Sequence, residues 1–268
     1  MTHLSDVLAV CRAEGRAAFI AYLPVGFPDV ARSLEAMRTV VAHGADVIEV
    51  GIPYTDPMLD GPVIQDAANT ALHAGTKVND AFTAVRAVVD AGAAAVVMTY
   101  WNIVLRRGPS RFARDLAAAG GSGVILPDLT PEEAGDWLAA ARDEGLDTIF
   151  LVAPSSTPER LATVTAAGSG FVYAASVMGV TGTRTTVGTA AHGLVERTRE
   201  VTDLPICVGL GVSTGAQAAE VAGYADGVIV GSALVRALAE SRSAEGDYTP
   251  LVALAEELAA GVRGMMPR

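Results

Sequence analysis

The residue with the clearest chemical potential is a carboxylate inside a short apolar run. Glu49 interrupts the run Val47–Gly51, where an unpaired charge would be costly. An apolar site favours the neutral form of a carboxyl group, which suits a general acid that must also act as a base. The alternative is a structural glutamate satisfied by the backbone or by an arginine. We favour the functional interpretation because Glu49 stands near the end of its run.

A second carboxylate follows in the next segment. Asp56 and Asp60 lie in a stretch whose two prolines and one glycine give the loop a defined shape. Asp-Pro and Asp-Gly are also ordinary turn pairs, so residue type alone does not separate Asp56 from Asp60. Either carboxylate, together with Glu49, would fit divided acid and base roles. Tyr173 is a further candidate because its small neighbours leave room for the hydroxyl, although a tyrosine within a strand is also a common core residue.

Glycine-rich segments follow the last three apolar runs. Glycine lets main-chain N–H groups approach an anion, and the N-terminus of a following helix adds its dipole. These segments therefore predict a phosphate site of the kind found after the last strands of α/β barrels. A dinucleotide fingerprint is excluded, because it belongs at the first β-α turn. The residues concerned are Gly179, Gly182, Gly209, Gly211, Gly231 and Ser232.

Composition excludes several classes of function. The chain has 268 residues, is 51% hydrophobic and carries a formal charge of −11, which argues against disorder and against general binding to nucleic acid or anionic membranes. Its one lysine, Lys77, lies outside every predicted strand, so we expect no Schiff-base mechanism. Scattered histidines predict no metal site, and the distant Cys11 and Cys207 predict two idle thiols. No targeting or membrane-spanning segment is recognised, so we expect a cytoplasmic protein.

Eight short apolar runs, each followed by a segment with helical periodicity, must position these residues. Nearly continuous apolar runs are typical of parallel strands buried on both faces. Eight β-α units in this length predict an α/β fold, a (β/α)8 TIM barrel, as one domain over residues 1–268, with additional helices at Leu4–Arg12 and Pro250–Val262. The runs are Phe19–Leu23, Val47–Gly51, Ala95–Tyr100, Val124–Pro127, Thr148–Val152, Phe171–Ala175, Ile206–Leu210 and Gly227–Val230.

Residues typical of helix starts, and the spacing between predicted strands, add detail to this predicted barrel. Thr130 before Pro131 and Thr157 before Pro158 are typical of helix N-termini. The two longest connections should lie over the C-terminal face, where barrel active sites lie. We predict both as long loops, Ile52–Val78 and Val177–Val187, and the clearest predicted helices are Val30–His43, Asp80–Asp90, Pro131–Glu144 and Gly215–Ala222.

These residues resemble the tryptophan synthase alpha subunit family over nearly the whole chain. The most specific block is Ile48–Pro57 together with Asp60–Gln65. Three positions differ from the usual family residues, namely Thr55, Ile103 and Arg107. The supporting blocks are Tyr22–Gly26, Met98–Asn102, Tyr173 with Gly179–Gly182, and Val208–Val212.

The resemblance implies a carbon–carbon lyase that cleaves indole-3-glycerol phosphate to indole and glyceraldehyde 3-phosphate, with no cofactor or metal in this chain. It implies that Glu49 protonates the indole ring carbon, and it selects Asp60 over Asp56 to stabilise the positive indole nitrogen and take its proton. Tyr173 would line the site. The remaining substrate contacts implied are Tyr22, Met98 and Tyr100 at the indole, and Thr181, Gly182, Gly211, Gly231 and Ser232 toward the phosphate.

The resemblance also implies a partner. The family pairs with a pyridoxal-phosphate beta subunit in an α2β2 heterotetramer, and Asp56 and Thr181 match residues that couple the two subunits. A free-standing lyase is the first alternative, and only activity of the isolated chain separates it from an alpha subunit. A barrel isomerase or epimerase would need other acid/base groups, and intact Glu49 and Asp60 argue against a catalytically inactive barrel.

Overall fold

Parallel strands form the centre of the molecule. The computed structural model describes residues 3–57, 59–175, 189–209, 211–242 and 245–264. Its strands pair in the order β5-β4-β3-β2-β1-β9-β8-β7-β6, and every pair of neighbours in that order is parallel. The bounds are β1 Ala18–Pro24, β2 Val47–Gly51, β3 Ala94–Met98, β4 Gly123–Ile125, β5 Asp147–Ile149, β6 Leu151–Val152, β7 Val172–Ala175, β8 Ile206–Gly209 and β9 Gly227–Val230.

The first and last strands of that order, β5 and β6, are joined by one residue of the chain. β5 and β6 are consecutive pieces of the predicted strand Thr148–Val152, separated by Phe150. The main-chain N–H of Tyr173 donates to the carbonyl oxygen of Phe150 at 3.1 Å, so the hydrogen-bonded circle is completed there. The predicted eight-stranded barrel is therefore confirmed, with its fifth strand divided in two.

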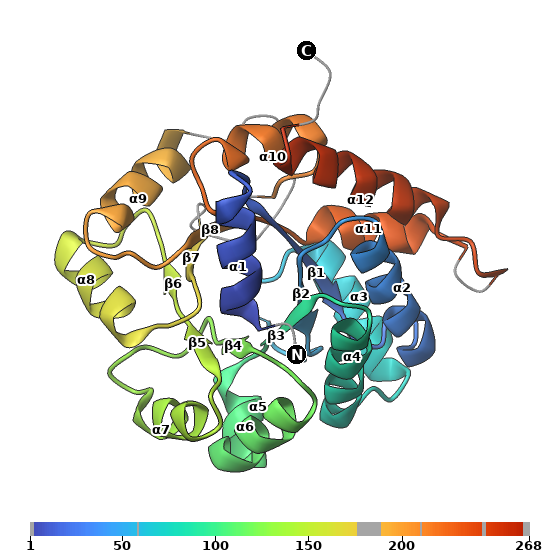
Figure 1. Ribbon diagram of the computed structural model, residues 1–268. Helices are drawn as coiled ribbons and strands as arrows, with labels where there is room; N and C mark the ends of the chain where they lie inside the picture. Colours follow the sequence, from blue (N-terminus) through green and yellow to red (C-terminus); the bar gives the residue numbers. More distant parts are fainter. Residues whose placement is uncertain (1–2, 58, 176–188, 210, 243–244, 265–268) are drawn as a thin grey trace.

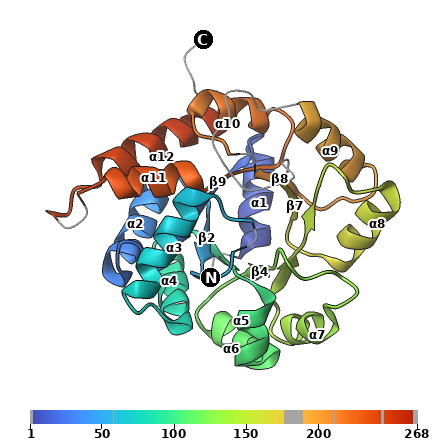
Figure 2. The same cartoon turned by 180° about the vertical axis from the view of Figure 1, so that it is seen from behind.

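Helices surround the strands, as Figures 1 and 2 show from opposite sides. The predicted additional helices at the two ends of the chain are both present as α1 and α12. The bounds are α1 Leu4–Ala13, α2 Val30–Ala42, α3 Pro62–His73, α4 Val78–Asp90, α5 Trp101–Arg107, α6 Pro109–Ala118, α7 Gly135–Asp143, α8 Pro158–Ala167, α9 Thr189–Arg199, α10 Gly215–Ala222, α11 Ser232–Glu240 and α12 Thr249–Val262.

Helix α1 covers the end of the barrel at which the strands begin (Figure 1). Its buried residues Leu4, Leu8 and Cys11 pack in one cluster with inward-facing side chains such as Val47 and Ala94. Burial of these apolar side chains closes the amino end of the barrel. The carboxyl end, where the strands stop, is left for the long connections.

Alternation along β2 decides where Glu49 points. Val47 belongs to the inner cluster, whereas Ile48 and Val50 pack outward against the helices. Because successive strand side chains point to opposite faces, Glu49 points inward like Val47. It pairs in register with Tyr22 on β1 and Val96 on β3.

Two local predictions were wrong. Residues Thr130–Glu133 form a turn in which the N–H of Glu133 donates to the main-chain oxygen of Thr130 at 3.1 Å, and α7 begins only at Gly135. Proline fits a turn as well as a helix start, so the local pattern did not distinguish them. By contrast, the Thr157 side chain accepts from the N–H of Arg160 at 3.2 Å, and α8 begins at Pro158 as predicted.

The second error concerns the connection Ile52–Val78, which is not loop throughout. It contains helix α3, whose buried face is formed by Ile64, Ala67, Ala68 and Ala71. In the part of this connection that is described, the irregular residues are therefore limited to 52–57, 59–61 and 74–77. The other long connection predicted, Val177–Val187, lies outside the described residues. In the part of the chain that is described, no helix is long and apolar enough to cross a membrane.

Candidate active site

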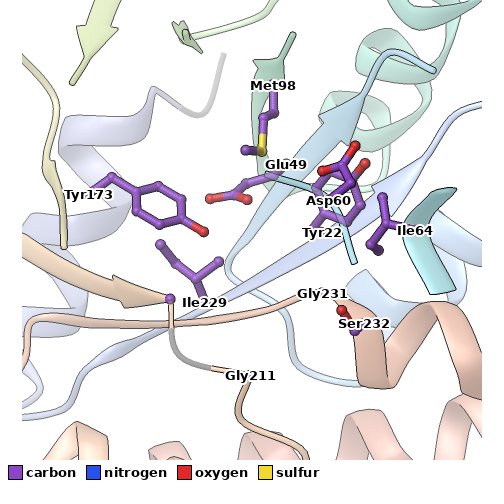
Figure 3. A pocket seen from close by; sticks show the side chains of 11 residues that line it. Tyr22, Glu49, Asp60, Ile64, Met98, Tyr173, Gly211, Ile229, Gly231 and Ser232 are labelled. Carbon is purple, nitrogen blue, oxygen red and sulfur yellow. The ribbon is translucent and has the colours of Figure 1, made fainter. Parts of the chain in front are cut away.

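A pocket opens at the carboxyl end of the barrel strands, and residues from six strands, two helices and three connections line it (Figure 3). It holds about 500 Å³ of empty space, part of it open to solvent, which is within the range of small-molecule sites. The lining residues are Tyr22, Glu49, Asp60, Ile64, Met98, Tyr173, Gly209, Gly211, Ile229, Gly231 and Ser232.

Glu49 is fully buried at the base of this pocket, with 0% of its surface exposed. Neither carboxyl oxygen has a hydrogen-bond partner among the described residues. Burial without such a partner penalises the charged form, and it raises the pKa of Glu49 to about 8. Near neutral pH, Glu49 is therefore a protonated acid that faces the cavity. Among the described residues, no backbone group or arginine bonds the carboxyl group, as the structural alternative would require.

Asp60 approaches the same pocket from the loop after β2. It is only partly buried, and burial raises its pKa to about 6. The Nε2 group of Gln65 on α3 donates to the main-chain oxygen of Asp60 at 2.8 Å, which ties this part of the loop to the helix. At neutral pH Asp60 is ionised while Glu49 is protonated, so the pocket contains one acid and one base.

Two tyrosines flank the carboxyl groups. Figure 3 shows Glu49 between Tyr173 on one side and Tyr22 with Asp60 on the other. Burial and the nearby carboxylates raise the pKa of both tyrosines well above the ordinary value, so both hydroxyls stay protonated. A Cβ atom at Gly51 would collide with the Tyr22 hydroxyl, and one at Gly209 would collide with the Tyr173 hydroxyl. Glycine at both positions leaves the space that these side chains occupy.

The opposite end of the pocket is suited to an anion. Gly231 and Ser232 lie where β9 gives way to α11, a helix whose N-cap makes no side-chain hydrogen bond. A helix N-terminus carries N–H groups without an intrahelical partner and the positive end of the helix dipole, which favours an anion at that end of the site. Gly211 has a φ of +70°, a left-handed conformation that favours glycine and brings its backbone to the pocket wall.

Helix α10 differs from α11 in this respect. The N–H of Gly215 donates to the Glu257 carboxylate at 2.7 Å, and the Thr214 side chain accepts from the N–H of Gln217 at 3.3 Å. A carboxylate already occupies that helix terminus. The structure therefore favours the segment at Gly231 and Ser232, with Gly211, over the α10 N-terminus as the anion-binding part of the pocket.

The remaining candidates lie in three different places. Met98 lines the pocket, whereas Tyr100 is not among its lining residues and lies beside it at the start of α5. Asp56 is exposed and accepts a hydrogen bond from the Thr55 hydroxyl at 2.5 Å. Thr181 and Gly182 lie outside the described residues, as does Gly179.

Two lining residues, Ile64 and Ile229, were not singled out from the sequence. Ile229 lies within an apolar strand, where the inward positions are known only once neighbouring strands are in register. Ile64 lies two residues after Pro62 in the first turn of α3, a helix inside the segment predicted as a long loop. A helix start at Gly61-Pro62 was the signal that could have placed Ile64 at the pocket.

The structure also shows where the residues capable of covalent or metal chemistry lie. Lys77 is exposed next to the start of α4 and does not line the pocket. Both cysteines are buried free thiols, as predicted, and burial raises the pKa of Cys11 to about 11. Within the described ranges, no three His, Cys, Asp or Glu side chains cluster as metal ligands would.

Comparison with known proteins finds one family along nearly the whole chain. The family model described as tryptophan synthase alpha chain matches residues 8–263. The tryptophan synthase alpha chain of Mycobacterium intracellulare is 59% identical over 262 residues, which cover 98% of this chain and 95% of that protein. The corresponding protein of Thermobifida fusca is 59% identical over 266 residues, covering 98% of both chains.

Solved structures give the same result. A chain of Mycobacterium tuberculosis tryptophan synthase superposes with a TM-score of 0.92 at 58% identity, covering 98% of both chains. Tryptophan synthase subunit alpha from Legionella pneumophila superposes with a TM-score of 0.88 at 30% identity, covering 98% of this chain and 99% of that one. The chain therefore belongs to the tryptophan synthase alpha chain family.

Proposed function

We propose that Glu49 and Asp60 are the acid/base pair with which this chain cleaves indole-3-glycerol phosphate to indole and glyceraldehyde 3-phosphate. One observation carries the assignment: a fully buried Glu49, without a hydrogen-bond partner among the described residues, shares a pocket with a carboxylate of lower pKa. The two groups have opposite protonation states at neutral pH. That is the condition for proton donation and acceptance at one substrate.

The reaction proceeds by protonation of the ring before the carbon–carbon bond breaks. Glu49 donates its proton to the indole carbon that carries the side chain, and the resulting positive charge extends to the ring nitrogen. Asp60 stabilises that charge and accepts the nitrogen's proton. The Glu49 carboxylate then removes the proton of the adjacent side-chain hydroxyl.

Cleavage of the carbon–carbon bond returns Glu49 and Asp60 to their starting protonation states. As the hydroxyl carbon becomes an aldehyde, the electrons of the broken bond return to the ring, and Asp60 returns the proton to the nitrogen. Glu49 ends protonated, as it began. The indole ring is the electron sink, so this route needs neither an imine-forming lysine nor a metal from this chain.

Substrate binding is divided between the two ends of the pocket. The backbone at Gly211, Gly231 and Ser232 binds the phosphate, supported by the N-terminus of α11. Tyr22 and Met98 contact the indole, and Tyr173 lines the reacting centre. This local site overcomes the repulsion that a chain of net charge −11 exerts on a phosphate.

The chain acts with a beta subunit in an α2β2 assembly, and the pyridoxal phosphate belongs to that partner. Support comes from the alpha-chain family and from the solved tryptophan synthase, whose chain superposes on this one. Asp56 is exposed on the loop that carries Asp60, which supports a role for it in coupling the two subunits. A cytoplasmic location fits a biosynthetic enzyme of this kind.

The test is indole release from indole-3-glycerol phosphate by the purified chain, with and without an added tryptophan synthase beta subunit. Slow release that rises strongly with the beta subunit is the expected result, because closure of the site over Asp60 would depend on the partner. Equally fast release without the partner would establish a free-standing lyase and refute the coupling. No release in either case would refute the assignment of Glu49 and Asp60.

A further inference from the structure

Asp60 lies on a loop, so the accurate placement of its carboxylate depends on contacts with other segments. The described part of residues 52–61, which follows β2, contains no helix or strand. A misplacement of about 1 Å in a catalytic group can cost about 10²-fold in rate. Gln65 fixes the carbonyl oxygen of Asp60, and the N–H of Ile52 donates to Met98 at 3.0 Å, so both ends of the loop are held. The residues between these two anchors need further support.

Tyr100 supplies a contact at that point. Its hydroxyl accepts a hydrogen bond at 3.4 Å from the N–H of Leu59, the residue immediately before Asp60. The Tyr100 ring stacks on the ring of Tyr54, with centroids 4.8 Å apart and planes at 26°. Tyr100 is only 7% exposed, so its ring is fixed by packing. One side chain of the neighbouring connection thus contacts the Asp60 loop at two places.

Asn102 adds a third contact between the same two segments. Its Nδ2 group donates to the Tyr54 hydroxyl at 3.3 Å. Residues 100 and 102 flank the first residue of α5, and Tyr54 lies two residues before Asp56 on the loop. The loop after β2 is therefore tied to the start of α5 through Tyr54 as well as through Leu59.

The start of α5 is itself anchored. Both carboxylate oxygens of Asp128, which follows β4, accept from the N–H of Trp101 at 2.9 and 3.0 Å. The α5 N-cap residue, Tyr100, makes no side-chain cap bond of its own, so Asp128 satisfies this terminus from another connection. A continuous series of contacts runs from the end of β4, through α5, to the residue before Asp60.

We propose that Tyr100, Tyr54 and Asn102 are positioning residues that hold the loop after β2 so that Asp60 meets the indole nitrogen. This rests on the proposed function, since it assigns to these residues the placement of the proton acceptor. Tyr100 acts through the backbone of Leu59 instead of contacting the reacting atoms. The resemblance alone had assigned it to the indole side of the pocket.

The primary test is Tyr100→Phe, which keeps the ring stack and removes the hydroxyl. We expect kcat for indole release by the full chain to fall about five-fold, as loss of one modest hydrogen bond predicts, with KM changed less than two-fold. The matched control is Tyr248→Phe, because the Tyr248 hydroxyl also makes a 3.4 Å bond, to the Arg32 carbonyl, and does not line the pocket. The control should leave kcat and KM unchanged. An unchanged kcat in Tyr100→Phe would overturn the proposal.

Amide hydrogen exchange at Leu59 tests the contact independently of catalysis. Exchange of this N–H should accelerate in Tyr100→Phe and remain at the wild-type rate in Tyr248→Phe. Asn102→Ala should accelerate it less, because it loosens Tyr54 and leaves the Tyr100 hydroxyl in place. Exchange at Leu59 that is identical in Tyr100→Phe and wild type would show that the hydroxyl does not restrain the loop.

A double variant separates the positioning role of Tyr100 from the proposed catalytic role of Asp60. In an Asp60→Asn background, Tyr100→Phe should cause no further loss of kcat, because its effect passes through Asp60. A full additional five-fold loss would mean that Tyr100 acts on the substrate directly, and would overturn the positioning role alone. Wild-type cleavage by Asp60→Asn itself would refute the proposed function, and with it this inference.

The pH profile gives a further readout that a general loss of folding would not produce. A loosened loop admits water to Asp60, so its pKa should move down toward the ordinary aspartate value. The acidic limb of kcat/KM should then shift to lower pH in Tyr100→Phe. Among the described residues, the other titratable groups that line this pocket are Glu49, Tyr22 and Tyr173. The basic limb, assigned to Glu49, should stay in place. A shift of both limbs together would contradict the proposal.

Discussion

The two carboxylates of the pocket are held in opposite ways. Glu49 is part of β2, which is paired on both sides in the barrel, and is fully buried. Asp60 lies on a loop, partly exposed, and is placed by Gln65 and by the contacts around Tyr100. Strand placement excludes water and gives a high pKa, whereas loop placement leaves a lower pKa and a position that neighbouring segments can adjust. We infer that control of activity acts through Asp60, and that Glu49 is the fixed partner.

Removing the fixed group should have the largest effect. Glu49→Gln keeps the size of the side chain but cannot donate a proton at neutral pH, so kcat for indole release should fall about 10³-fold. Steady-state release and single-turnover quenching measure this loss. Cleavage at the wild-type rate would refute the acid/base role.

The stability of the same variant is its control. The pKa of Glu49 is raised on folding from 4.5 to about 8, so ionisation of wild-type Glu49 opposes folding increasingly as pH rises between these values. Glu49→Gln removes that penalty. Its melting temperature at pH 8 should therefore equal or exceed that of the wild type, which excludes unfolding as the cause of lost activity. A much lower melting temperature would contradict the absence of a satisfying partner for Glu49.

Removing the adjustable group should cost less. Asp60→Asn loses the charge that stabilises the positive indole nitrogen, and we expect kcat to fall about 10²-fold. Binding of glycerol 3-phosphate, as a probe of the phosphate end, should be nearly unchanged in isothermal titration. Lost affinity with unchanged chemistry would instead give Asp60 a substrate-positioning role.

The anion end of the pocket should respond through affinity. Gly211→Val adds a β-branched side chain at a φ of +70° and blocks the approach of an anion to the backbone. We expect affinity for glycerol 3-phosphate to fall about ten-fold or more, as loss of a charge-assisted hydrogen bond predicts. Gly246→Val is a matched control, since Gly246 has a φ of +76° and does not line the pocket. Equal affinity in the Gly211 variant and wild type would remove Gly211 from the phosphate site.

The smallest effect is expected at the far end of the contacts that support Asp60. Asp128→Ala leaves the N–H of Trp101 without its carboxylate, so the free energy of unfolding should fall by about 1 kcal/mol, a typical capping loss. Activity should fall only about two-fold, since the Tyr100 hydroxyl remains in place. Urea unfolding and steady-state kinetics measure the two. A loss of activity as large as that of Asp60→Asn would contradict the order of effects.

Much of the fold could be predicted because the apolar runs mark the barrel strands directly. The runs around Val47–Gly51 and Gly227–Val230 match the observed strands because each is buried on both faces. The interruption at Phe150 and the turn at Thr130 could not be predicted. Strand pairing decides the first, and the second depends on a choice between two conformations that the same local residues allow.

Some residues of the site could likewise be predicted from the sequence, and others could not. Glu49 is recognisable from local sequence because a carboxylate in an apolar strand is unusual. Ile229 is not recognisable, because its type is common and only register shows which way it points. The Tyr54–Asn102 contact joins residues that are distant in sequence and lie in connections after neighbouring strands, so no local pattern indicates it.

The pH dependence of kcat/KM for indole release tests the divided roles most directly. Asp60 must be ionised to accept a proton, so the rate should fall about ten-fold per unit as pH drops below about 6. Glu49 must be protonated to donate, so the rate should fall likewise as pH rises above about 8. The expected profile is therefore bell-shaped, and its acidic limb should be absent in Asp60→Asn. A profile that is flat across both values, or an acidic limb that persists in Asp60→Asn, would contradict it.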